Sequence, residues 1–81
     1  MDLDITPDSK ALFIAYAKDA GNWSGTPLVG GNVSGSKEAR GNLTHLKKLG
    51  LLDTFVDAGT WISFTAKGGE YAASLGITID R

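Results

Sequence analysis

The chain has 81 residues, with eight Lys and Arg against nine Asp and Glu, one histidine and no cysteine. A chain of this length folds as one domain with a modest core, which excludes large catalytic architectures. The absence of cysteine excludes disulfides, thiolate metal sites and cysteine nucleophiles, and one histidine alone does not make a zinc site. We therefore expect a single domain over residues 1–81 without a metal, a cofactor or enzymatic activity.

The N-terminal residues 1–4 include two acidic side chains, where a secretory signal needs basic residues followed by an apolar run. No part of the sequence approaches the roughly 18 consecutive apolar residues that cross a membrane. We expect a cytoplasmic protein that makes no contact with a membrane.

A first helix is predicted over residues 7–20. Thr6 is a good N-cap residue, and Pro7 suits the first helical position because its missing N–H would have no partner there. Apolar residues follow at helical spacing until Gly21, which ends the pattern. Trp23 lies between two turn signals, and we expect it to cover the core from a short extended piece.

A short second helix is predicted next along the chain. Thr26 and Pro27 repeat the cap-then-proline pattern ahead of two apolar residues. Gly30 and Gly31 end any helix there within about a turn and a half. We therefore expect a brief helical piece between two turns, ahead of a longer third helix.

The third predicted helix, residues 36–49, is strongly amphipathic. Ser36 is a good N-cap residue, and Gly50 stands where a left-handed C-terminal residue is needed. At about 100° per residue, Leu43 and Leu46 fall on one side, so that side is expected to pack against the core. The opposite side carries polar and basic residues, namely Lys37, Arg40, Gly41, Thr44 and Lys48.

The excess positive charge of the chain lies in this region. Residues 34–50 contain four basic side chains and one acidic, a net charge of +3, whereas residues 1–20 and 51–81 each have a net charge of −2. A solvated helix face accounts for most basic stripes of this kind, and that interpretation stays open. His45 flanks the stripe, and we expect it to be solvated or to touch phosphate, not to bind a metal.

A β-hairpin and a last helix are predicted after Gly50. Residues 51–56 and 60–65 are rich in β-forming residues, and the connection 57–59 ends in glycine, as many hairpin loops do. Alternation along the second strand places Ile62 and Phe64 on the face toward the core and leaves Trp61 partly outside. Thr65 then caps a helix that ends before Gly76.

Two segments carry a resemblance to a known family. Residues 46–52 are similar to the leucine-rich helix end and glycine turn of winged helix-turn-helix domains, most of all those of the MarR type. Residues 64–71 are similar to the wing strand of that family, which runs into a Leu-Thr-x-x-Gly pattern. The resemblance implies an α+β fold with a three-helix core, a short β-hairpin wing and a C-terminal helix.

The resemblance also implies a function. Recognition helices of this class enter the major groove, so the helix over residues 36–49 is expected to bind double-stranded DNA in a transcriptional regulator. Near its start, Lys37 and Arg40 are expected to reach phosphate or a guanine edge, and Lys47 and Lys48 the sugar–phosphate backbone. The full set of expected contact residues is Ser36, Lys37, Arg40, Gly41, Thr44, Lys47 and Lys48.

An alternative function follows from the predicted wing. The family usually places Arg or Lys there, whereas this chain has Asp57, which repels phosphate. A winged helix with an acidic wing and a partly exposed Trp61 suits protein–protein interaction, for instance a phage or mobile-element protein that binds a host factor. The long helices through which MarR-type regulators dimerise are missing from this sequence, so we leave open a monomer or a homodimer.

Overall fold

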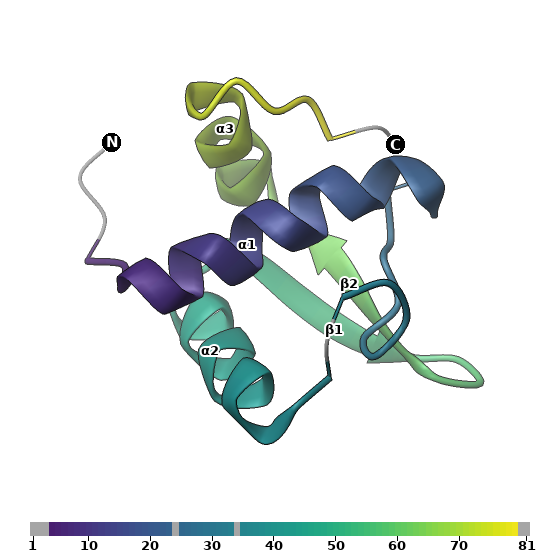
Figure 1. The fold of residues 1–81 in the computed structure, drawn as a ribbon. Helices are drawn as coiled ribbons and strands as arrows, with labels where there is room; N and C mark the ends of the chain where they lie inside the picture. The colour runs from purple at the N-terminus through teal and green to yellow at the C-terminus, as the bar shows by residue number, and fades with distance from the viewer. Residues whose placement is uncertain (1–3, 24, 34, 80–81) are drawn as a thin grey trace.

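The computed structural model describes residues 4–23, 25–33 and 35–79. These residues form a small α+β fold with a two-stranded antiparallel hairpin, as the sequence predicts, but with three α-helices instead of the four expected (Figure 1). The elements are, in order, α1 (Pro7–Asp19), the 3-10 turn η1 (Ala20–Asn22), α2 (Lys37–Lys48), β1 (Leu52–Val56), β2 (Thr60–Phe64) and α3 (Ala66–Ser74). In the described part of the chain, no helix has the length and apolarity that a membrane span requires.

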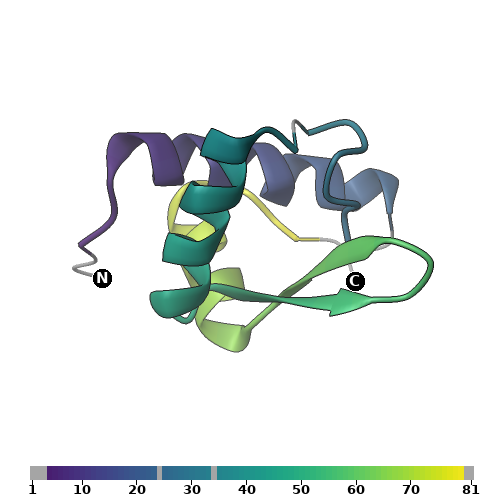
Figure 2. The ribbon, with the colours of Figure 1, turned by 90° about the horizontal axis from the view of Figure 1, so that it is seen from below.

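The three helices and the hairpin enclose one core. Figure 1 shows α1 lying across α2 and the hairpin, and Figure 2 shows the turn of the hairpin projecting beyond the helices. Phe13 of α1 is fully buried, with its ring 5.8 Å from that of Phe64 on β2 and 5.2 Å from that of Tyr71 on α3. Aromatic contacts at these separations add to the area that each ring removes from water. Phe13 therefore joins α1 to both C-terminal elements.

The hairpin has the predicted connection and alternation. Its strands pair from Leu52 opposite Phe64 to Val56 opposite Thr60, around residues 57–59. Ile62 and Phe64 are buried, whereas Trp61 is half-buried and Ser63 is exposed, as expected from side chains that alternate between the two faces of a strand.

The expected second helix is wrong. Residues 26–29 are extended and pair with the free side of β2, where the Val29 N–H donates to the Thr60 carbonyl at 2.8 Å and the Ile62 N–H donates to the Pro27 carbonyl at 2.8 Å. A helix nucleus must fix several residues before it gains one hydrogen bond, and two apolar residues before a glycine pair are too few. The free edge of β2 instead provides hydrogen-bond partners for the backbone groups of residues 26–29. Within the described residues, α2 is thus preceded by an extended segment instead of a helix.

Trp23 also differs from the expectation of an extended piece. It ends η1 with φ −128° and ψ 19°, which is a turn conformation, and its indole N–H donates to the Asp19 carboxylate at 2.9 Å. The same carboxylate accepts from Asn22 at 3.0 Å and from Asn32 at 2.9 Å. Burial raises the pKa of Asp19, but these three hydrogen bonds outweigh it and leave the pKa below its usual value. Asp19 therefore fastens the loop after α1.

Candidate nucleic-acid interface

The helix expected to bind DNA is fixed at its N-terminal half by α1. The Ser36 hydroxyl caps α2 by accepting from the Ala39 N–H at 3.2 Å. The fully buried Ser9 of α1 donates its hydroxyl proton to the Asn42 side-chain carbonyl at 3.2 Å. Leu43, one residue further on, is 7% exposed. These contacts fix which face of α2 points inward.

The C-terminal end of α2 is fixed by a glycine cap and a lysine. Gly50 has φ +77°, and the Leu51 N–H donates back to the Leu46 carbonyl at 3.2 Å, as in the Schellman motif that ends many helices. Lys67 of α3 donates from Nζ to the Leu49 carbonyl at 2.9 Å. A cation there also complements the negative end of the helix dipole. The rotation of α2 about its axis is therefore set at both ends.

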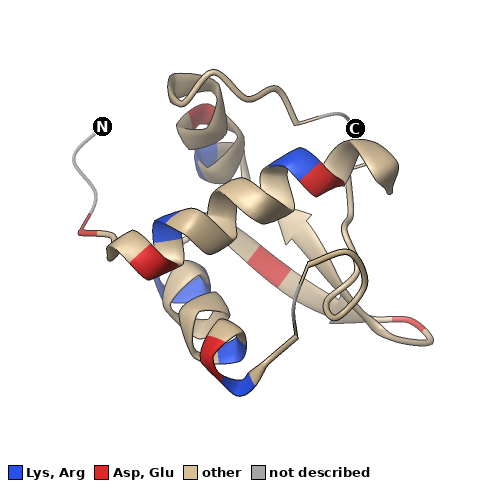
Figure 3. Cartoon of the chain, in the orientation of Figure 1, with Lys and Arg blue, Asp and Glu red and all other residues tan. Residues whose placement is uncertain are grey.

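All seven expected contact residues are exposed on the outer side of α2. They are Ser36, Lys37, Arg40, Gly41, Thr44, Lys47 and Lys48, called here the contact face. In Figure 3 the blue ribbon segments that mark Lys and Arg occur along the length of α2. Among the residues that the structure describes, Lys37, Arg40 and Lys48 form no ion pair and no side-chain hydrogen bond. Their charges are thus available to an anionic partner.

Two members of the contact face already hold intramolecular hydrogen bonds. Thr44 donates its hydroxyl proton to the Arg40 carbonyl at 3.1 Å, so only its lone pairs are available to a partner. Lys47 donates from Nζ to the hydroxyl oxygen of Thr54 on β1 at 3.2 Å. Lys47 therefore leans toward the hairpin, whereas Lys48 makes no such contact in the described residues.

A cleft of about 280 Å³ separates α2 from the hairpin. It is lined by Val29, Arg40, Leu43, Thr44, Lys47, Thr54 and Thr60, and we call it the α2–hairpin cleft. Arg40, Thr44 and Lys47 are among the contacts expected from the sequence, whereas Thr54 and Thr60 are not. The position of Thr54 could have been predicted from strand alternation, which places it on the same face as the buried Leu52.

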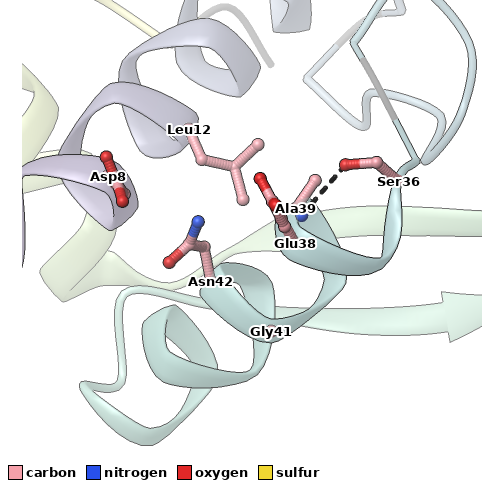
Figure 4. A pocket seen from close by; sticks show the side chains of 7 residues that line it. All are labelled: Asp8, Leu12, Ser36, Glu38, Ala39, Gly41 and Asn42. Carbon is pink, nitrogen blue, oxygen red and sulfur yellow. Dashed lines mark hydrogen bonds between the residues drawn. The ribbon is translucent and has the colours of Figure 1, made fainter.

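A second hollow, of about 530 Å³, lies between the N-terminal halves of α1 and α2 (Figure 4). Two of its lining residues are acidic, Asp8 from α1 and Glu38 from α2, and Figure 4 shows both beside it. Ser36 and Gly41 of the contact face also line this hollow. The carboxylates lower the positive potential at this end of the contact face, so the potential is strongest from Arg40 to Lys48.

His45 does not fit the expectation of a solvated or phosphate-contacting side chain. The residue is half-buried, and its Nε2 atom is buried with no hydrogen-bond partner among the described residues. The ring is therefore partly covered, with Nε2 turned away from solvent, to one side of the contact face. Within residues 4–23, 25–33 and 35–79, no three His, Asp or Glu side chains come close enough together to hold a metal ion.

The projecting end of the hairpin is acidic and apolar. Asp57 is exposed, Phe55 is 42% exposed and Val56 is 81% exposed. Trp61 is less open, because its ring packs 5.4 Å from that of Trp23 and its N–H donates to the Asp57 carbonyl at 2.8 Å. The exposed apolar surface of the hairpin is thus made by Phe55 and Val56.

Comparison with known protein families, curated proteins and solved structures finds no match for this chain. Its functional interpretation rests on the geometry and charge of α2 and the hairpin.

Proposed function

We propose that the protein is a small DNA-binding protein of the winged helix-turn-helix type, similar to MarR-type regulators, that acts in transcriptional regulation. In this proposal α2 lies in the major groove of double-stranded DNA and the hairpin is the wing. The observation that carries the proposal is the contact face, which is exposed along one side of a helix whose other side is buried through Leu43 and Leu46.

The dimensions and charges of α2 suit this role. Its 12 residues span about 18 Å at 1.5 Å per residue, and an α-helix fits the width of the major groove. Lys37, Arg40 and Lys48 have no acidic partner in the described residues, so binding to phosphate breaks no ion pair. Arg40, near the start of α2, reaches phosphate or a guanine edge, and a bidentate contact to guanine discriminates bases by about 1–3 kcal/mol.

The extended segment at residues 26–29 departs from the fold that the resemblance implies. In a helix-turn-helix the preceding helix positions the recognition helix. In this chain α1 holds α2 directly, through the Ser9–Asn42 hydrogen bond, and Lys67 holds its other end. The proposal requires only that the orientation of α2 is fixed. The contacts from Ser9 and Lys67 fix it without the short helix that was expected before α2.

A salt titration tests the proposal. Fluorescence anisotropy with a mixed-sequence duplex is expected to give an affinity that falls steeply with salt, with a slope that decreases by about 0.9 for each phosphate contact removed. Lys48→Ala is expected to lower both affinity and slope. Lys18→Ala is the matched control, since Lys18 is an exposed lysine on α1. Absence of duplex binding below about 100 µM at low salt, the weak limit of non-specific binding, would overturn the proposal.

A second candidate function is protein–protein interaction through the hairpin, favoured by the exposure of Phe55 and Val56 beside Asp57. Exposed apolar groups rimmed by polar ones are typical of protein-binding surfaces. Phe55→Ser with Val56→Thr is then expected to abolish copurification of a cellular partner and to leave duplex binding unchanged. Trp61→Ala is a poor test, because Trp61 supports the fold through Trp23.

A further inference from the structure

The α2–hairpin cleft combines two cations with two hydroxyl groups from a different element. Arg40 and Lys47 come from α2, whereas Thr54 and Thr60 come from the hairpin. Arginine and lysine beside hydroxyl donors are the side chains that bind phosphate oxygens. We propose that this cleft binds a phosphate group, which in a DNA complex is a backbone phosphodiester; the second step rests on the proposed function.

The donors of the cleft remain available. Arg40 has five N–H donors and uses none of them in a side-chain hydrogen bond to a described residue. Lys47 gives one of its three protons to Thr54, which leaves two. Because the Thr54 oxygen accepts that bond, its own proton is free to point to an anion, and the neighbouring charge makes it a stronger donor.

The Thr60 hydroxyl makes no hydrogen bond within the described residues, so it is a further available donor. Thr44 differs, because its proton is held by the Arg40 carbonyl. The anion is thus held from two sides, by the cations of α2 and by the hydroxyls of the hairpin.

Among the residues that the structure describes, none that lines the cleft carries a carboxylate. The nearest one along the chain, Asp53, is held at the edge of β1, where its Oδ1 accepts from the Thr54 N–H at 2.8 Å. Asp57 lies at the turn of the hairpin, and Glu38 lines the separate hollow near α1. An anion in the cleft is therefore not in contact with Asp53, Asp57 or Glu38.

The size and the apolar residues of the cleft also fit a phosphate. A water molecule occupies about 30 Å³ in the liquid, so a cleft of about 280 Å³ holds a phosphate with part of its hydration shell. Val29 and Leu43 line it as apolar groups, and they reduce the screening of Arg40 and Lys47 by water. In a DNA complex the backbone then passes the side of the hairpin that carries Thr54 and Thr60, while Asp57 lies in the turn beyond Thr60.

The first experiment uses inorganic phosphate with the full chain. Two-dimensional ¹⁵N NMR spectra are recorded during titration with sodium phosphate and, at matched ionic strength, with sodium chloride. Phosphate is expected to shift the Arg40 side-chain Nε–H and the amides of Thr54 and Thr60, and chloride is expected not to. Thr54→Val, which removes only the hydroxyl, is expected to abolish these shifts. The control Thr78→Val alters an exposed threonine outside the cleft and should leave them intact.

The second experiment measures duplex binding by the same variants. Losing one hydrogen bond to an anion is expected to weaken duplex binding roughly two- to tenfold in Thr54→Val. Lys47→Met is expected to abolish the phosphate shifts and to weaken duplex binding, whereas Lys48→Met should weaken duplex binding only. If Thr54→Val does not fold, as shown by its circular dichroism, Thr60→Val serves the same purpose.

The outcomes separate this proposal from the proposed function. Phosphate shifts in the cleft without duplex binding support the site, identify a free phosphate as its ligand and overturn the DNA proposal. Duplex binding that Thr54→Val and Thr60→Val leave unchanged, with no specific phosphate shifts, overturns the site and leaves the DNA proposal standing. Loss of the phosphate shifts in Thr54→Val, together with duplex binding weakened roughly two- to tenfold, supports both proposals.

Discussion

Gly68 of α3 lies so close to Leu51 that a Cβ atom at position 68 would overlap the Leu51 carbonyl. The same carbonyl accepts from the Thr65 N–H at 3.2 Å, and the Thr65 hydroxyl caps α3 by accepting from the Gly68 N–H at 3.0 Å. The Thr65 hydroxyl also donates to the Gly50 carbonyl at 2.6 Å. The first turn of α3 is thus joined to the turn that ends α2, and the approach requires glycine at position 68.

Gly68→Ala is therefore expected to destabilise the protein by about 3 kcal/mol, the upper range of overpacking, because backbone atoms on both sides must move. Gly69→Ala is the matched control: nothing lies within 4 Å of its Cβ position, and alanine in a helix is favoured over glycine by about 1 kcal/mol. Urea unfolding measures both. Equal stability of the two variants would contradict the close approach at Gly68.

Gly41 separates stability from binding. It lies in the interior of α2, exposed, with nothing within 4 Å of its Cβ position. Gly41→Glu is expected to stabilise the helix by about 0.5–1 kcal/mol, because glutamate has the higher helix propensity. It should nevertheless weaken duplex binding, since a carboxylate then stands in the contact face. Thermal unfolding and anisotropy check the two effects, and undiminished duplex binding would place Gly41 outside the interface.

Asp19 is expected to make stability depend on acid. The pKa of Asp19 is lowered in the folded protein, so its contribution is fully present above the unfolded value of about 3.9 and is lost as pH falls through the folded value. Asp19→Asn should cost about 1–3 kcal/mol at neutral pH, because the hydrogen bonds from Trp23 and Asn32 lose a charged acceptor. Urea unfolding from pH 2 to pH 7 should show a shallower acid dependence in this variant. If the free energy of unfolding of this variant depended on pH as in the unsubstituted protein, the hydrogen bonds to the Asp19 carboxylate would not stabilise the loop.

Asp57→Lys is expected to strengthen duplex binding. The side chain is exposed at the end of the hairpin, and reversing its charge replaces repulsion of the DNA backbone by attraction. Glu70→Lys on α3 is the matched control, because it changes the net charge equally at an exposed site on another element. Anisotropy at low salt should show a larger gain for Asp57→Lys. Equal gains would show that the hairpin is not near the DNA.

Local signals predicted most of the fold. The caps at Thr6 and Ser36, the left-handed Gly50 and the connection at residues 57–59 each use hydrogen bonds within a few residues, so the sequence shows them directly. The outward side of α2 followed from the positions of its leucines. All these features depend on residues close together in the chain.

The missed features depend on distant parts of the chain. The segment 26–29 is extended because β2, more than 30 residues away along the chain, offers it a free edge, whereas Thr26 and Pro27 alone resemble a helix start. The contribution of Thr54 to the α2–hairpin cleft requires knowledge of how α2 packs beside β1. The buried Nε2 of His45 is likewise a property of packing, not of helical position.

The most direct test of the central claim is to map duplex binding on the protein by ¹⁵N NMR. We expect DNA to shift the amides of α2 from Arg40 to Lys48, together with those of Thr54 and Thr60, and these shifts to decrease as salt is added. Shifts confined to the hairpin end around Phe55 and Val56, or no shifts at low salt, would contradict it.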